Sequence, residues 1–246
     1  MFNFGFNRKT IIIIVVVMAV FWIATAGING ILSVVLLAPA VLIALTFHEF
    51  AHGYVAYKLG DETPKLQGRL NLNPIKHLDP IGTIFLVVAG IGWGKPVQID
   101  PRNFNSKYSI SKAEAIVAAA GPLMNFIIAF LFTILSFIII KYTSLIQSLS
   151  GDWQYVAVFL LQSVITINIG LGVFNLIPLP PLDGSKVLSH FLPYNARQWF
   201  YNNQQIFMIV FLLIWLTPIA SNVISPAITG ISNGMGWLVY SIFGVF

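Results

Sequence analysis

Cysteine is absent from this chain of 246 residues, and charged residues make up only 9% of it. Without cysteine the chain can form neither a disulfide nor a thiolate metal site, so any metal has to bind to His, Asp or Glu. An ordinary soluble domain carries roughly 25% charged residues. Because so few charges cannot cover a water-soluble surface, and 57% of the residues are hydrophobic, we expect a membrane protein.

Several apolar runs approach or exceed the ~20 residues that a helix needs to cross a bilayer. We predict an all-α membrane protein with about six transmembrane helices, forming one domain over residues 1–246 with its core at about 30–190. The predicted spans are residues 10–27, 32–59, 111–140, 153–174 and 206–215, with one short or kinked span within 217–246.

A shorter apolar stretch, residues 81–91, lies between the second and third predicted spans. It is too short to cross the membrane, and the following Gly92-Trp93-Gly94-Lys95-Pro96 breaks helical geometry. We therefore predict a re-entrant or β-like element here. Such an element is tolerated in a membrane only where protein or water satisfies its backbone, and its edge at 91–97 could pair with an extended substrate.

The net charge of +5 is scattered between apolar segments and does not gather on a soluble face. The positive-inside rule explains it better than nucleic-acid binding does. Arg8 and Lys9 place the N-terminus in the cytoplasm and make the first run a signal anchor or a signal peptide; we favour the uncleaved anchor, although Ala24-Thr25-Ala26 resembles a cleavage site. In this topology twelve of thirteen basic residues lie inside. The predicted location is the cell membrane.

His48, Glu49 and His52 form an H-E-x-x-H pattern inside the second predicted span. The i to i+4 spacing puts both imidazoles on one helical face, where they can reach one tetrahedral Zn²⁺ ion. Glu49 would lie beside the metal, where it can take a proton from water and pass it to a leaving amine. In soluble helices the pattern often arises by chance. In lipid one Glu alone costs about 2.5 kcal/mol or more, which favours a functional site.

A catalytic zinc also needs a third protein ligand and an open position for water. Asp183 is the candidate, because it follows the fourth predicted span on the side of the membrane nearer to His52. The preceding segment, 175–182, contains three prolines that stiffen the chain, and Gly184 permits a tight backbone. On this segment alone, an ordinary Asp-Gly turn after a helix is the simpler interpretation.

A third motif, Gly121-Pro122-Leu123-Met124-Asn125, lies in the third predicted span. With the H-E-x-x-H pattern and segment 175–184, it makes residues 30–190 resemble the site-2 proteases, the intramembrane zinc metalloproteases of the M50 class. The resemblance is closest to short bacterial members without PDZ-like or CBS-like domains. It implies an all-helical membrane protease that cuts a transmembrane segment of a single-span substrate near the cytoplasmic face, often after an earlier cut.

The resemblance also implies roles for individual residues. His48, His52 and Asp183 would bind Zn²⁺, Glu49 would be the general base, and Asn125 would hold the substrate backbone or the developing oxyanion. Asn125, Asn168 and Asn175 could equally form interhelical hydrogen bonds.

Two other functions remain open at this point. An intramembrane metal or ion transporter would also place His, Glu and Asp in the membrane, but transporters often show matching repeats, and the sequence contains none that we detect. A non-proteolytic membrane protein of the same fold is the other alternative. We interpret His77 and His190 as interfacial residues.

Overall fold

The computed structural model of the chain describes residues 8–80, 82–83, 94–215 and 217–244. Within these residues every regular element is a helix, as predicted. In chain order they are α1 (Arg8–Lys58), α2 (Thr63–Leu66), the 3-10 helices η1 (Pro74–Lys76) and η2 (Pro101–Asn103), α4 (Ile110–Tyr142), α5 (Gly151–Asn175), α6 (Asp183–Phe191), α7 (Tyr194–Asn202), α8 (Gln204–Trp215) and α9 (Pro218–Phe243).

Three helices among the described residues are long and apolar enough to cross a membrane: Leu32–Lys58, Ile110–Tyr142 and Gly151–Asn175. They match the second, third and fourth predicted spans and support a multi-pass membrane protein. Gly27 separates the first predicted run from the second, because its φ of 61° interrupts the helical geometry of α1. With 12 residues, α8 is shorter than a crossing requires. The structure thus supports three of the roughly six predicted spans.

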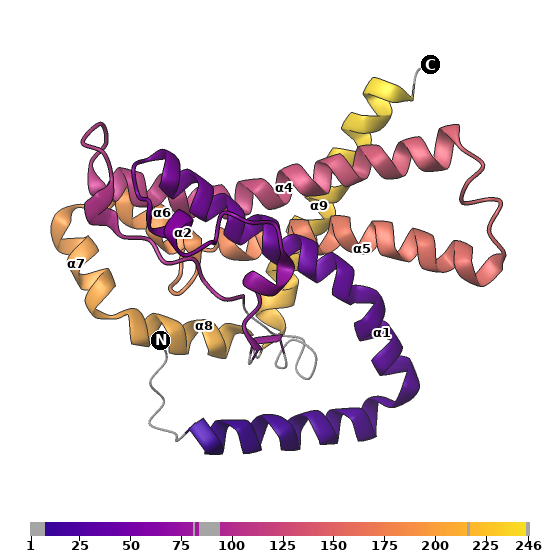
Figure 1. Cartoon of the computed structure of the whole chain (residues 1–246), viewed down its shortest axis with the longest axis horizontal. Coiled ribbons are helices and arrows are strands. Elements are labelled where there is room, and N and C mark those ends of the chain that lie inside the picture. Colours follow the sequence, from indigo (N-terminus) through magenta and orange to yellow (C-terminus); the bar gives the residue numbers. More distant parts are fainter. Residues whose placement is uncertain (1–7, 81, 84–93, 216, 245–246) are drawn as a thin grey trace.

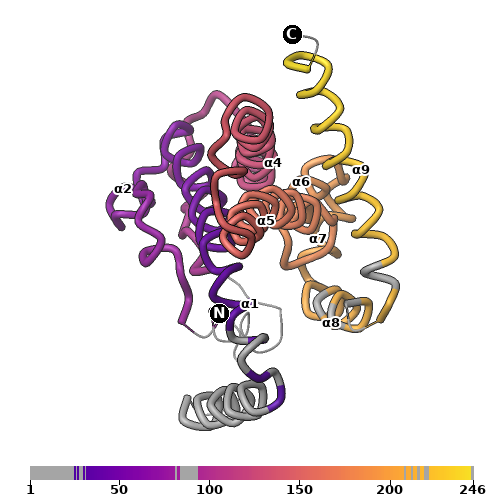
Figure 2. The backbone as a smooth tube through the Cα atoms, turned by 90° about the vertical axis from the view of Figure 1, so that its right-hand side faces the viewer, coloured from indigo at the N-terminus to yellow at the C-terminus, as the bar shows by residue number. Residues whose placement is uncertain are grey.

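The second half of α1 packs beside α4 and α5, and these three helices form the centre of the molecule (Figures 1 and 2). Buried Ala40, Ile128 and Val164 contribute one residue from each helix to a shared apolar cluster. Ala40 is the small side chain at this contact, and small side chains let membrane helices approach closely. A second cluster joins α4 and α5 to α9, on the other side of α5 (Figure 2).

The short helix α6 returns the chain to α4 after α5 has ended at Asn175. A prolyl segment separates α5 from α6, and the end of α5 lies directly against Gly184. A Cβ atom at Gly184 would lie 2.6 Å from the carbonyl oxygen of Ile177 and would also overlap the carbonyl of Leu176. The absence of a side chain therefore lets Asp183, the first residue of α6, fold back toward α1.

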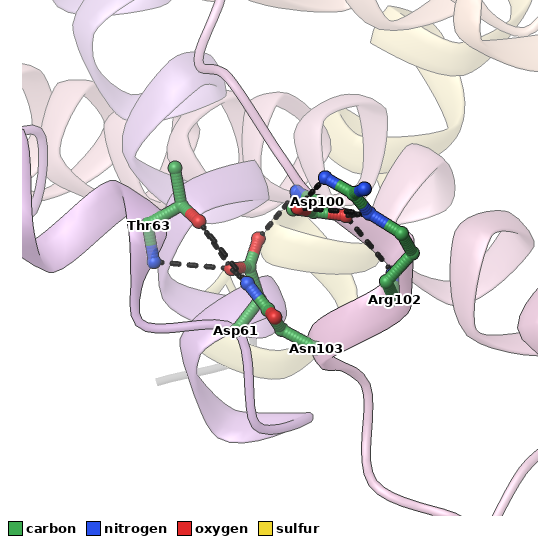
Figure 3. Close-up of polar contacts among 5 residues, drawn as sticks. All are labelled: Asp61, Thr63, Asp100, Arg102 and Asn103. Atoms are coloured by element: carbon green, nitrogen blue, oxygen red, sulfur yellow. Dashed lines mark hydrogen bonds and ion pairs between the residues drawn. The ribbon is translucent and has the colours of Figure 1, made fainter.

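A buried carboxylate, Asp61, fixes the chain just beyond the end of α1 (Figure 3). Its Oδ1 accepts hydrogen bonds from the backbone N–H of Thr63 at 3.0 Å, from the Thr63 hydroxyl at 2.6 Å and from Asn103 Nδ2 at 3.0 Å. Its Oδ2 accepts from the backbone N–H of Asp100 at 2.8 Å. These bonds hold the 94–103 segment against the end of α1.

The opposite end of the 94–103 segment is held by Arg69. This guanidinium is only 5% exposed, and it donates to the backbone carbonyls of Lys76 and Lys95. The N–H of Lys95 donates to the carbonyl of His77 at 2.8 Å, and Leu78 forms an isolated antiparallel bridge with Gly94. The two chain segments that flank the predicted re-entrant element therefore lie side by side. Most of that element, residues 81 and 84–91, falls outside the described residues.

Acidification should release the 94–103 segment from α1. Burial alone would raise the pKa of Asp61, but the hydrogen bonds from Thr63, Asn103 and the Asp100 amide outweigh burial and hold this pKa below its ordinary value. A lowered carboxyl pKa stabilises the folded state at pH values above about 4 and loses that contribution as pH falls through the folded-state pKa. We expect the protection of the Asp100 amide against hydrogen exchange, taken relative to the intrinsic exchange rate at each pH, to fall below about pH 4.

The Asp61→Asn variant should show the same low protection of the Asp100 amide already at neutral pH. Replacing the charged acceptor costs roughly 2 kcal/mol of local stability. Glu62→Gln removes a neighbouring, exposed charge and serves as the control. Equal Asp100 exchange in wild-type protein and Asp61→Asn would contradict the assigned role of this carboxylate.

Candidate active site

His48, His52 and Asp183 converge at one point between α1 and the start of α6. The two Nε2 atoms lie 3.0 Å apart. Asp183 Oδ2 lies 3.2 Å from His48 Nε2 and 3.1 Å from His52 Nε2. Donors of a tetrahedral Zn²⁺ site, bound at about 2.0–2.1 Å, are separated by roughly 3.3 Å. The three atoms therefore have the spacing of one face of such a site, and they form a candidate metal-binding group.

The chemistry of these donors also fits zinc. Asp183 Oδ2 is buried and, despite its short distances to both imidazoles, accepts no hydrogen bond. Burying a carboxylate oxygen without a hydrogen-bond donor costs free energy. A cation bound between this oxygen and the two imidazole nitrogens would remove that cost. Two neutral imidazoles and one carboxylate, with no cysteine in the chain, form a ligand set of the catalytic type that leaves a fourth position open.

Each imidazole is oriented by a hydrogen bond on the side away from the metal-binding point. His48 Nδ1 donates to Asn125 Oδ1 and His52 Nδ1 donates to the carbonyl oxygen of Val117, both at 2.7 Å. Because each Nδ1 carries the proton, each Nε2 presents its lone pair toward Asp183. Such outer contacts fix the tautomer and ring orientation of metal-binding histidines.

Asn125 is fully buried behind His48, and its amide group is engaged in several hydrogen bonds. Besides accepting from His48, it donates through Nδ2 to the Ala44 carbonyl at 3.0 Å and to Asn168 Oδ1 at 2.9 Å. Asn125 and Asn168 therefore form an interhelical hydrogen bond, an alternative that the sequence left open. A substrate or oxyanion contact of Asn125 stays a prediction, since it requires the amide to give up one of these partners.

Gly121 of α4 lies directly against both imidazoles. A Cβ atom there would lie 2.6 Å from His52 Cε1 and 2.7 Å from His48 Cε1, and would overlap His52 Nε2. These separations are below any ordinary van der Waals contact. The glycine of the Gly121-Pro122-Leu123-Met124-Asn125 motif thus provides the space in which α1 can place its two histidines against α4.

A methyl group at Gly121 should therefore weaken metal binding. In Gly121→Ala both imidazoles have to move away from Asp183, and we expect zinc affinity to fall at least about ten-fold, as when outer-shell support is lost. Bound zinc in the purified protein measures this.

Gly170→Ala provides the matched control, because its Cβ would meet only Ile228 Cδ1, at 3.4 Å. Normal zinc binding by Gly121→Ala would show that the two helices are not constrained as the contacts indicate.

Glu49 lies beside the histidines and faces a cavity of about 380 Å³. Its Oε2 accepts a hydrogen bond from the backbone N–H of Val97 at 3.0 Å. The 94–103 segment, held at its ends by Arg69 and Asp61, thus orients the carboxylate that lies next to the metal-binding point. The cavity is lined by α1, α4, the end of α5 and the start of α6 as well as by this segment.

The other histidines lie away from the metal-binding group. His77, predicted at the interface, is fully buried and its Nε2 donates to the Asn71 carbonyl at 2.6 Å. His190 is half-buried, with its Nδ1 at 3.3 Å from the Ser111 hydroxyl. Sequence reasoning did not foresee the roles of Arg69, Val97 and Val117. The last two act through backbone atoms and leave no signal in the side-chain pattern.

The chain is 38% identical over 209 residues to "Putative zinc metalloprotease YwhC" of Bacillus subtilis (strain 168), covering 84% of this chain and 92% of that protein. It is 30% identical over 210 residues to "Putative zinc metalloprotease Rip2" of Mycolicibacterium smegmatis, covering 81% of this chain and 75% of that protein. A third relative, "Putative zinc metalloprotease MJ0611" of Methanocaldococcus jannaschii, is 29% identical over 189 residues, covering 75% of this chain and 86% of that protein.

No solved structure matches the chain significantly. The family model "Peptidase family M50" matches residues 35–217, a range that includes His48, Glu49, His52 and Asp183. The chain therefore belongs to peptidase family M50, the site-2 proteases, and is an intramembrane zinc metalloprotease.

Proposed function

We propose that the chain hydrolyses a peptide bond in the transmembrane segment of a single-span membrane protein, with His48, His52 and Asp183 as the zinc ligands. The observation that carries this assignment is the convergence of three possible metal ligands, the two imidazole Nε2 atoms and the buried Asp183 Oδ2 that accepts no hydrogen bond, at 3.0–3.2 Å from one another. Bound zinc supplies a Lewis acid that polarises the scissile carbonyl and lowers the pKa of the attacking water.

Glu49 acts as the general base and then as the general acid. Its carboxylate accepts a proton from the attacking water and delivers it to the nitrogen of the leaving amine. The hydrogen bond from the Val97 N–H to Oε2 leaves Oε1 available for this transfer. His48 and His52 keep their protons on Nδ1 throughout, because Asn125 and Val117 hold them there.

The site lies near one end of its membrane span. His52 precedes Lys58, the last residue of α1, by six residues, which corresponds to roughly 9 Å along a helix. The loops beyond this end carry Lys65, Arg69 and Lys76, so by the positive-inside rule this end faces the cytoplasm. A crossing by residues 10–27 would place the N-terminus in the cytoplasm as well. Cleavage would then take place near the cytoplasmic face of the cell membrane.

Glu49→Gln tests the reaction directly. It keeps the shape of the side chain but removes the base, so we expect normal zinc content and at least about a 100-fold loss of peptide cleavage, the contribution typical of general acid–base catalysis. Purified protein and a panel of single-span substrates provide the assay, with Glu62→Gln as the control. A metal transporter would instead show zinc flux that depends on His48 and His52, with no peptide product.

A helical substrate has its peptide groups bonded internally, so it must unwind before hydrolysis and needs new partners for the freed groups. The described part of the 91–97 edge, residues 94–97, lies beside Glu49 and could supply such partners by strand addition. Val97→Pro removes from this edge the N–H that bonds Glu49 Oε2, so it tests how the edge positions the base. We expect cleavage to slow roughly ten-fold, as for loss of a hydrogen bond to a charged group, with unchanged zinc content. Unchanged cleavage would argue against any role for this edge.

A further inference from the structure

A second carboxylate, Glu114 of α4, lines the same cavity as Glu49 and the three metal-binding residues. It has no part in the chemistry described above. The spacing of α4 shows how it reaches the cavity: Ala118, Gly121 and Asn125 follow Glu114 at i+4, i+7 and i+11 and so share its helical face. Gly121 and Asn125 of this face contact the histidines. Glu114 therefore belongs to the face of α4 that forms the site.

The Glu114 side chain is half-buried, yet it makes no hydrogen bond and no ion pair with the described residues. Lys186 and Arg197 are the basic residues whose charges act on it, but neither lies within ion-pair distance among the parts of the chain that the structure describes. Arg197 donates hydrogen bonds to the backbone carbonyls of Ser189, His190 and Leu192 instead. A carboxylate in this position keeps its charge only while water or an added cation reaches it.

A substrate bound in the cavity changes the surroundings of the Glu114 carboxylate. A peptide that fills the apolar part of the cavity displaces water from Glu114, and a partly buried carboxylate then needs a donor. The substrates expected for this enzyme are membrane segments, whose cytoplasmic ends carry Lys and Arg. Glu114 lies near the start of α4, just after Lys107 and Lys112, at the level where such residues would enter. The substrate itself can therefore supply the missing cation.

The position of this cation along the substrate follows from helix geometry. Glu114 and Gly121 are seven residues apart on α4, which corresponds to about 10 Å along the helix axis. An extended peptide covers about 10 Å with three residues. A basic side chain some three residues from the scissile bond would thus meet Glu114 when the bond lies at the metal-binding point.

We propose that Glu114 is a specificity-determining residue that binds a Lys or Arg side chain of the substrate about three residues from the scissile bond. The proposal rests on the proteolytic function proposed above. Lys186 of α6 also lines the cavity, and its charge acts on Glu114, so the substrate cation would compete with it. The subsite thus favours a basic residue over a neutral one and leaves the cleavage step to Glu49.

The experiment compares pairs of single-span substrates that differ only in Lys or Gln, placed at each position from two to four residues on either side of the cut. Full-length, zinc-loaded protein should prefer the Lys substrate at one position by about five-fold in kcat/KM, the effect of one partly exposed ion pair. In Glu114→Gln this ratio should fall to about one, through a higher KM for the Lys substrate. Glu114→Lys should prefer the matching Glu substrate.

Two control variants separate the proposal from a structural role. Glu62→Gln removes an exposed charge elsewhere and should keep the preference for Lys, and Lys186→Gln should keep or increase it. The proposal is overturned if Glu114→Gln retains the preference, if it slows both substrates equally, or if the preference is lost only in Lys186→Gln.

Binding distinguishes this proposal from the proposed proteolytic function. If the wild-type protein cleaves neither substrate, the proteolytic assignment fails, and the affinity of zinc-loaded Glu49→Gln for the same two peptides is then compared. A preference for Lys in binding that disappears on adding Glu114→Gln supports the subsite. Equal binding of both peptides overturns it.

Discussion

The contact between α1 and α4 at Gly121 is the constraint on which the site depends. Two imidazoles on one helical turn can share a metal only if their Nε2 atoms point to the same place, and the neighbouring helix must leave room for them while also directing them. Gly121 leaves the room, and the Val117 carbonyl and Asn125 amide on the same helix direct the rings. One face of α4 therefore both accommodates and orients the imidazoles. It does so through the missing side chain of Gly121, the backbone carbonyl of Val117 and the side-chain amide of Asn125.

Polar groups in this centre are linked in a continuous series. His48, Asn125 and Asn168 connect α1, α4 and α5, and Asn168 closes the series on the carbonyl of Val164 in its own helix at 2.8 Å. An amide or imidazole in a membrane protein is costly when it lacks a partner, and a fully satisfied network also fixes a single arrangement of the helices. Catalytic geometry and helix packing thus use the same hydrogen bonds.

The candidate metal-binding group could be predicted from the sequence because charged residues are rare in this chain, and their presence in an apolar span favours a functional role. His48 and His52 followed from helical spacing, whereas Asp183 became a firm candidate only through family resemblance, since proximity between distant segments leaves no local pattern. For the same reason Glu114 was not foreseen: its relation to Gly121 is visible in the spacing, but that face of α4 has meaning only once α1 lies against it. The predicted number of spans was less successful. Length and apolarity support three crossings among the described residues, and α8, with 12 residues, is too short for one.

Asp183 is the first residue of a nine-residue helix outside the predicted spans, whereas the two histidines belong to α1. A bound ion would therefore join chain segments separated by more than half of the sequence and close a long loop in the way a covalent cross-link does, removing conformations from the unfolded ensemble. The chain contains no cysteine and so forms no disulfide. The ion that supplies the chemistry would also provide this cross-link and keep α6 docked on the membrane helices.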